Sequence, residues 1–150
     1  MFTLIRTSSD NIDFKNFVKL LDEDLQIRDG DEHSFYAQFN TIDSLKHVVV
    51  SFMEKEAIGC GAFRQLNSQK VEIKRMFVHP KYRGRAAATT ILNELEKWAA
   101  ELNYTEALLE TGKKQPEAIS LYKKTGYGII PSYGQYLNVE NSVCMMKKLQ

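Results

Sequence analysis

Residues 71–92, VEIKRMFVHPKYRGRAAATTIL, join a strand pattern to a helix pattern across a short basic turn. The first part is rich in β-branched and aromatic side chains, which is typical of a strand. After the alanines, apolar side chains recur at helical spacing, and this helix is expected to end near Asn103. TEALLE at 105–110 is again typical of a strand. The chain is therefore expected to form a strand–helix–strand unit over 71–110, and such a unit pairs its two strands in parallel.

Two further strand patterns precede this unit. KHVVVSFME at 46–54 contains three consecutive valines, which predicts burial on both faces of the sheet. IGCGAFRQL at 58–66 contains Gly59 and Gly61, which favour a bulge or a close approach of another backbone. Because only short turns separate these strands from each other and from residues 71–78, the three should form an antiparallel meander.

The ends of the chain add the remaining elements. Residues 2–7 are typical of a strand, and apolar residues from Phe14 to Leu25 recur at helical spacing. Residues 34–40 are expected to form a short helix or a loop. A second late helix, at 115–126, has Pro116 in its first turn and Gly126 at its end, and residues 127–130 and 142–149 are typical of strands. The predicted order is β-α-α-β-β-β-α-β-α-β-β in one domain over residues 1–150, of the α/β (α+β) class.

Composition excludes several kinds of protein. A net charge of +1 gives no strong field that would recruit nucleic acid or anionic lipid. No apolar run reaches the roughly 18 residues that a membrane span needs. Cys60 and Cys144 are far apart, which argues against a disulfide scaffold and predicts a cytoplasmic protein. The three histidines, His33, His47 and His79, lack the spacing of metal ligands, so no metal site is expected.

The basic turn at residues 83–88, RGRAAA, is a candidate anion site. The first N–H groups of a helix have no partner within the helix, and the helix dipole favours negative charge there. Small side chains would let a phosphate reach those groups, and Arg83 and Arg85 would add charge-assisted contacts. The alternative is a solvated basic turn before a helix that is rich in alanine because alanine favours helices. This stretch alone leaves both interpretations open.

Two segments resemble the GNAT superfamily of N-acetyltransferases. RMFVHPKYRGRAAATTIL is similar to its acyl-CoA-binding signature, which is Arg or Gln, two residues, Gly, one residue, then Gly or Ala. Arg83 and Ala88 fit this signature, whereas Ala86 replaces the central glycine. QPEAISLYKKTGY resembles the second conserved segment, N-x-x-A-x-x-L-Y-x-x-x-G-Y, with Gln115 in place of Asn. The resemblance covers about residues 46–149.

The resemblance implies a fold and a cofactor. The fold is a mixed, mostly antiparallel sheet of six to seven strands with about four helices, in which the fourth and fifth strands splay apart around the thioester of acetyl-CoA. The implied cofactor contacts are Met76, Phe77 and Val78 for the pantetheine arm, Arg83, Gly84, Arg85, Ala86, Ala87, Ala88 and Thr89 for the pyrophosphate, and Gln115. A backbone N–H near Phe77 would face the thioester carbonyl. Ala86 would fit without strain if its φ angle is negative and would be strained if φ is positive.

Glu72 matches the general base of some family members. Strand alternation would place it on the same face as Lys74, Met76 and Val78. As a base, it would remove a proton from the acceptor amine, directly or through a water molecule. The alternative is an ion pair with Lys74, Arg75 or a cross-strand lysine on a solvated face of the sheet.

Tyr122 matches the usual general acid of the family. Its phenol could donate a proton to the leaving thiolate. The alternative is a core tyrosine whose hydroxyl hydrogen-bonds to the backbone.

The acceptor side is less specified. Glu110 and Thr111, at the end of a strand, could bind the ammonium group and the cofactor or substrate. Tyr36, Tyr133 and Tyr136 could shape the acceptor pocket, although aromatic residues are more often simply packed. Together these features predict transfer of an acetyl group from acetyl-CoA to a primary amine in a ternary complex, with a homodimer compatible with the family. The alternative function is a catalytically silent acyl-CoA-binding regulator on the same fold.

Overall fold

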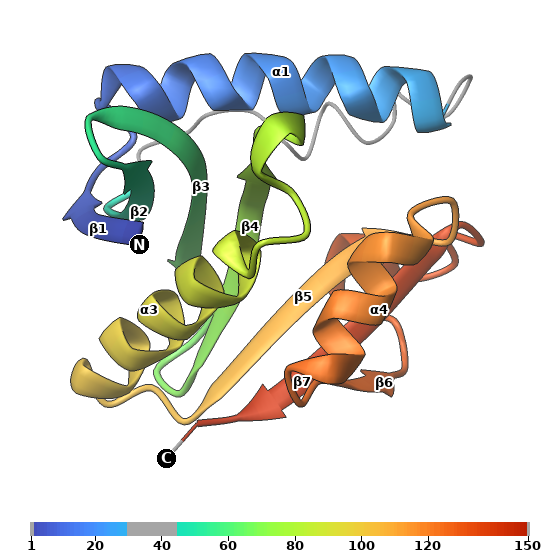
Figure 1. Cartoon of the computed structure of the whole chain (residues 1–150). Coiled ribbons are helices and arrows are strands. Elements are labelled where there is room, and N and C mark those ends of the chain that lie inside the picture. The colour runs from blue at the N-terminus through green and yellow to red at the C-terminus, as the bar shows by residue number, and fades with distance from the viewer. Residues whose placement is uncertain (1, 30–44, 150) are drawn as a thin grey trace.

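The computed structural model describes residues 2–29 and 45–149. A seven-stranded sheet in the order β1-β2-β3-β4-β5-β7-β6 runs through the molecule (Figure 1). The strands are β1 (Phe2–Thr7), β2 (His47–Met53), β3 (Glu56–Gln65), β4 (Lys70–Val78), β5 (Glu106–Gly112), β6 (Gly128–Ile130) and β7 (Ser142–Lys148). The described helices are α1 (Ile12–Asp29), α3 (Ala87–Glu101) and α4 (Pro116–Lys124), and short 3-10 turns cover Pro80–Tyr82 and Gly134–Tyr136.

This architecture confirms the predicted mixed sheet. β2, β3 and β4 form the predicted antiparallel meander. β4 pairs in parallel with β5, and α3 connects the two strands. Pro116 lies in the first turn of α4, and Gly126, with a φ of 104°, follows its C-cap. The helix or loop predicted at residues 34–40 lies outside the described residues.

Two hydrophobic cores lie on opposite faces of the sheet. α1 covers one face, and α3 and α4 cover the other (Figure 1). The consecutive residues Val48, Val49 and Val50 of β2 are all fully buried, because successive side chains point to opposite covered faces. The predicted burial of this strand on both faces is therefore confirmed.

The two glycines of β3 make room for a close neighbour. A Cβ atom on Gly59 would lie 2.8 Å from the carbonyl oxygen of Phe77, and one on Gly61 would lie 2.5 Å from the sulfur of Met76. Ile91 of α3 crowds both positions. Only glycine allows β4 and α3 to pack this close, as the sequence predicted.

A β-bulge in β4 changes the direction of its side chains. Arg75 and Met76 together lie opposite Gly61 of β3, and Arg75 has a φ of 60°. After the bulge, Met76 and Val78 pack on the α3 side, with Ile73, while Phe77 packs on the α1 side. The prediction that Glu72 shares a face with Met76 and Val78 is therefore wrong, because the extra residue reverses the alternation.

The same strand separates from its parallel neighbour. β4 pairs with β5 only from Lys70 to Glu72, opposite Glu106 to Leu108. β4 continues to Val78 and β5 to Gly112, but beyond Glu72 and Leu108 these two strands no longer pair with each other. The predicted splay between the fourth and fifth strands is confirmed, and it opens the sheet at its centre.

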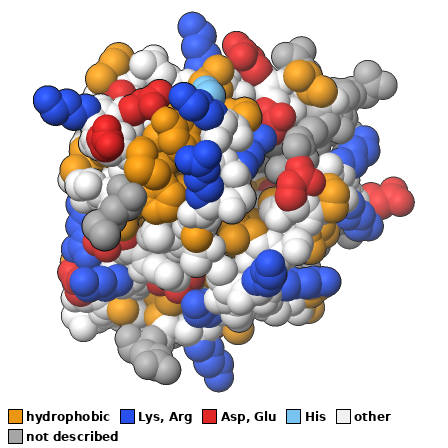
Figure 2. Space-filling view, viewed as in Figure 1, with side chains coloured by type: hydrophobic (Ala, Val, Ile, Leu, Met, Phe, Trp, Pro, Cys, Tyr) orange, Lys and Arg blue, Asp and Glu red, His pale blue; other side chains and the backbone are white. Residues whose placement is uncertain are grey.

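The face shown in Figure 2 carries charges of both signs. Lys and Arg side chains are interspersed there with Asp and Glu, around a group of hydrophobic side chains. In the described ranges, 2–29 and 45–149, no helix is long and apolar enough to span a membrane.

Candidate active site

A cavity of about 120 Å³ lies where β4 and β5 separate. Its lining comes from α1, β4, β5, α4 and the segment before β7, and consists of Leu21, Glu72, Ile73, Lys74, Arg75, Met76, Glu110, Thr111, Gly112, Gln115, Ala118, Tyr122 and Tyr136. The lining includes residues from both faces of β4, with Ile73 and Met76 packed on the α3 side and Glu72 on the other. Seven residues predicted from the sequence meet in it, namely Glu72, Met76, Glu110, Thr111, Gln115, Tyr122 and Tyr136.

Glu72 is the centre of a buried polar network on the α1 side. Its side chain is 1% exposed. Arg64 of β3 donates from Nε to Oε1 at 2.7 Å, and the Tyr133 hydroxyl donates to Oε2 at 2.6 Å. The Nζ atom of Lys74 lies 3.8 Å from Oε1. The predicted ion pair with Lys74 thus exists, but the shorter contact is with an arginine, and the carboxylate does not lie on a solvated face.

Tyr133 therefore contacts Glu72 rather than lining the cavity, where a substrate contact had been predicted. Tyr136, which packs edge to face on Tyr133, is 3% exposed and does line it. Burial first, and then the charge of Glu72, raise the pKa of both phenols, so both stay protonated at neutral pH. Tyr36 lies outside the described residues.

Glu110 and Thr111 lie on the other strand of the cleft. Glu110 accepts a hydrogen bond of 2.6 Å from the Ser142 hydroxyl of β7. Thr111 is buried, with 6% exposure, and follows on the opposite face of β5. Both predicted positions therefore line the cavity, one on each side of the sheet.

Tyr122 lines the cavity from α4 and is 7% exposed. Among the residues that the structure describes, none forms a hydrogen bond with its hydroxyl, so the alternative of a backbone-bonded core tyrosine has no support there. Burial, and to a smaller extent the charge of Glu110, raise the pKa of this phenol. The group is consequently a neutral O–H on a residue that lines the cavity. Gln115, the N-cap residue of α4, lines the same wall without capping the helix through its side chain.

The loop before α3 lies beyond the cavity along β4. Ala86 is the N-cap of α3 and has φ 65° and ψ 13°, and Gly84 has φ 81°. The N–H of Thr90 is the first to bond within the helix, to Ala86 O at 3.0 Å. The N-cap residue forms no side-chain hydrogen bond to this end of the helix. The N–H groups of residues 87–89 are therefore presented as backbone donors. The φ angle of Ala86 is positive, which is the strained of the two conformations considered from the sequence.

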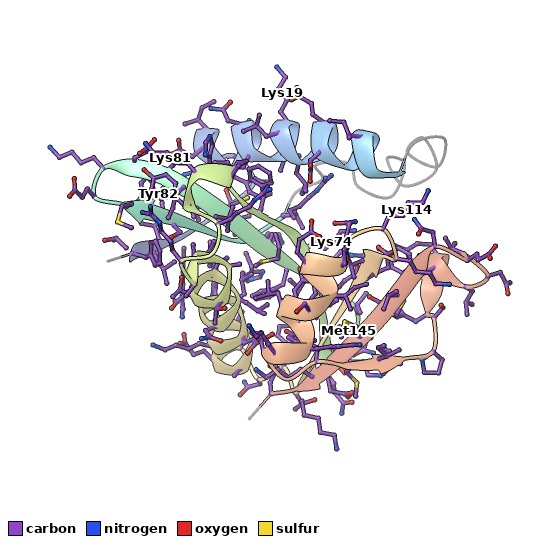
Figure 3. All side chains as sticks on the ribbon, turned by 45° about the vertical axis from the view of Figure 1, so that its right-hand side comes forward. Lys19, Lys74, Lys81, Tyr82, Lys114 and Met145 are labelled. Carbon is purple, nitrogen blue, oxygen red and sulfur yellow. The ribbon has the colours of Figure 1, made fainter. Side chains whose placement is uncertain are left out.

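Side chains tie this loop to its surroundings. Arg83 donates from Nε to the Val78 carbonyl at 2.8 Å, and its guanidinium lies 5.4 Å from the centre of the Phe77 ring. The Tyr82 hydroxyl donates to Glu56 at 2.5 Å, and Arg85 lies over the Tyr82 ring. Figure 3 labels Tyr82 on the opposite side of the molecule from Lys114. The side chains of Phe77 and Val78 are buried, so these predicted cofactor contacts can offer only backbone groups.

Four polar residues of the site had no functional prediction. Arg64 and Ser142 hold the two carboxylates, and Lys74 and Arg75 line the cavity. Regular strand alternation would place Lys74 and Arg75 on opposite faces of the sheet. Because of the bulge, both line the cavity. Within the described part of the chain, no three His, Cys, Asp or Glu residues are arranged to hold a metal ion.

Known proteins resemble this chain in sequence. A sequence model described as the Acetyltransferase (GNAT) family matches residues 14–127. An IAA acetyltransferase of Azospirillum brasilense is 36% identical over 93 residues, which are 61% of each chain. An uncharacterized N-acetyltransferase, YsnE, of Bacillus subtilis (strain 168) is 31% identical over 96 residues, 63% of this chain and 64% of that protein. The match therefore spans just under two thirds of the length of these curated relatives.

Solved structures resemble it over the whole length. A Klebsiella pneumoniae subsp. pneumoniae MGH 78578 protein assigned as an acyl-CoA N-acyltransferase has a TM-score of 0.84 and 25% identity, over 100% of this chain and 99% of that one. PaiA N-acetyltransferase of Thermoplasma acidophilum, in complex with coenzyme A, has a TM-score of 0.71 and 18% identity, over 99% of both chains. The second likeness concerns the fold alone.

Proposed function

The chain belongs to the GNAT family of acetyltransferases, and from this premise we propose that it transfers the acetyl group of acetyl-CoA to a primary amine of a small molecule or peptide. In this proposal the amine attacks the thioester directly, in a ternary complex. One observation carries the proposal: Glu72 from β4 and Tyr122 from α4 line one cavity at the point where the two strands separate. Direct transfer requires a base for the amine and an acid for the leaving thiolate on either side of the reacting carbonyl.

The described residues fit acetyl-CoA. The cofactor would supply the activated thioester. The free N–H groups of residues 87–89 suit the pyrophosphate, since a helix N-terminus favours negative charge. Gly84 and Ala86 carry no bulky side chain, and a Cβ on Gly84 would meet no atom within 4 Å, so the space beside Gly84 is open. A relative of the same fold has been solved with coenzyme A.

Each of the chain's own groups has a distinct part in the proposed reaction. Glu72 accepts the proton of the amine, directly or through water, and Arg64 and Tyr133 hold its carboxylate in place. Tyr122 donates its proton to the departing sulfur. A backbone N–H near Phe77 stabilises the negative charge that develops on the carbonyl oxygen. Positioning and this contact would supply most of the rate enhancement.

A catalytically silent acyl-CoA-binding regulator is the second candidate. Both oxygens of Glu72 already accept hydrogen bonds, which favours a structural role for this carboxylate. Such a protein would bind CoA without turning it over.

Tyr122→Phe separates the two candidates. We expect the variant to lower kcat with amine acceptors by roughly a hundredfold or more, while the Kd for CoA stays within about twofold, because the phenol does not bind the nucleotide. Tyr104→Phe is the matched control, since Tyr104 packs on Phe63 away from the cavity. Release of CoA thiol and calorimetry of CoA binding are the measurements. CoA binding by the wild type without turnover of any amine would establish the regulator.

A further inference from the structure

Two consecutive cationic residues, Lys74 and Arg75, line the same cavity. Neighbouring residues of a regular strand point to opposite faces. The left-handed backbone of Arg75, with φ 60°, breaks this rule and turns both side chains toward the α1 side. Positive φ in a residue other than glycine is strained, and such strain is concentrated at functional sites. Figure 3 labels Lys74 near the centre of the molecule, below α1.

Both cations are deeply buried. The side chains of Lys74 and Arg75 are 10% and 2% exposed. Arg75 Nη1 pairs with Asp22 of α1 at 3.1 Å, and the Asp22 side chain is itself 46% exposed. Glu72 Oε1 lies 3.8 Å from the Lys74 ammonium and 2.7 Å from Arg64 Nε. Burial lowers the pKa of the Lys74 ammonium, and a further anion beside it would offset that cost.

One carboxylate lies on the facing side of the cavity. Glu110 lies on β5, across the splay from Lys74 and Arg75 on β4. Ser142 holds the Glu110 side chain by a 2.6 Å hydrogen bond. The space between the strands therefore has Lys74 and Arg75 on β4, where Arg64 pairs with the neighbouring Glu72, and a fixed carboxylate on β5. This polarity matches a molecule that carries an amine at one end and an anion at the other.

Resting on the proposed function, we infer that the acceptor is a small amine that also carries a carboxylate, which Lys74 and Arg75 bind while Glu110 faces the amino group. A guanidinium presents a planar fork of N–H donors that matches a carboxylate, and the ammonium adds a point charge. The exposed Asp22 keeps Arg75 compensated before the acceptor arrives. This class of acceptor includes free amino acids and excludes diamines and uncharged amines.

Matched acceptors test this inference on the intact protein. A panel of amino acids is compared with the corresponding amino amides, which keep the amine and the size but lack the negative charge. We expect kcat/KM to favour the best acid over its amide by at least about tenfold, because a site built for a group discriminates strongly against its absence. In Lys74→Met this ratio should fall to within about threefold, and Lys74→Arg should restore most of it. Lys148→Met, at an exposed position on β7, should leave the ratio unchanged.

The outcomes are distinct. Equal or better turnover of amides, diamines or amino phosphonates, or an unchanged ratio in Lys74→Met, would overturn the inference but leave the acetyltransferase intact. CoA binding without turnover of any acceptor would overturn the proposed function and this inference with it. A change in fold lowers kcat/KM for acids and amides alike, so the ratio isolates the role of Lys74.

Discussion

The cavity between β4 and β5 is built from buried side chains, whereas the loop that leads into α3 presents mainly backbone. In the cavity, Glu72 is 1% exposed and both its oxygens are hydrogen-bonded to residues from other segments. In the loop, residues 83–86 are exposed, and the groups that suit a phosphate are the N–H groups of residues 87–89. One region depends on which side chains meet, and the other on the backbone angles that the residues adopt.

This difference predicts how each region responds to substitution. Removing a side chain from the cavity leaves buried charges without partners, which is costly. Removing the Arg85 side chain from the loop leaves no buried charge without a partner, because Arg85 is exposed. A substitution that changes the allowed backbone angles should instead have a clear effect in the loop.

Glu72→Ala should give the largest effect. Arg64, Lys74 and Tyr133 would lose their shared acceptor, and we expect the free energy of unfolding to fall by about 3 kcal/mol. This value is at the low end for a broken buried pair, because the Arg64 side chain is 40% exposed. Urea denaturation monitored by circular dichroism measures it.

Arg64→Gln is the matched control for Glu72→Ala. Arg64 is partly exposed, so water can replace it beside Glu72. The loss in free energy of unfolding should therefore be under about half of that for Glu72→Ala. If Glu72→Ala costs less than 1 kcal/mol, the cavity network is not stabilising and the contrast with the loop fails.

Tyr133→Phe should give the next largest effect. The variant removes one donor to a buried carboxylate, which costs about 1.5 kcal/mol of stability. If Glu72 acts as the base, kcat should fall as well, while the Kd for CoA stays constant, because Tyr133 does not line the cavity. A fall in stability with kcat unchanged would mean that Tyr133 supports the fold alone.

The loop was the easier region to predict from sequence, because its residues are contiguous. The strand, the basic turn and the alanines at residues 71–92 predicted the helix N-terminus, and α3 begins at Ala87. The element order and the parallel pair followed from periodicity and from the strand–helix–strand rule. The φ angle of Ala86 remained open, because the sequence is compatible with either sign.

The cavity was only partly predictable, because its residues come from distant segments. Glu72 and Tyr122 were found through resemblance, whereas Arg64, Ser142 and the pairing of Tyr133 with Glu72 depend on strand register. Arg75 could not be placed, since no residue of β4 itself marks the bulge. The glycines of β3 favoured a bulge or a close approach, and Gly61 does lie opposite the bulge, but they do not say which β4 residue it shifts.

Ala86→Gly tests the loop through its backbone. The φ of 65° costs alanine but not glycine, so the variant should be more stable by about 1 kcal/mol. The preformed turn should also bind CoA a few times more tightly. Calorimetry of CoA binding and thermal denaturation measure both effects.

Ala88→Gly provides the matched control for Ala86→Gly. Ala88 lies inside the first turn of α3, where glycine lowers stability by roughly 0.5–1 kcal/mol. Opposite signs for the two substitutions are expected. If Ala86→Gly also destabilises, the left-handed conformation at residue 86 is not the one adopted in solution.

Arg85→Gln should give the smallest effect and so completes the contrast. Arg85 is exposed, and its guanidinium lies 5.7 Å from the centre of the Tyr82 ring. Removing one solvated charge from a phosphate site should weaken CoA binding by about 0.5 kcal/mol at low salt, and the loss should shrink further as ionic strength rises, because salt screens exposed charges. Unfolding stability should not change measurably. A loss of CoA affinity that persists at high salt would mean that the Arg85 side chain, and not the helix N-terminus, holds the anion, and the loop would then resemble the cavity in depending on its side chains.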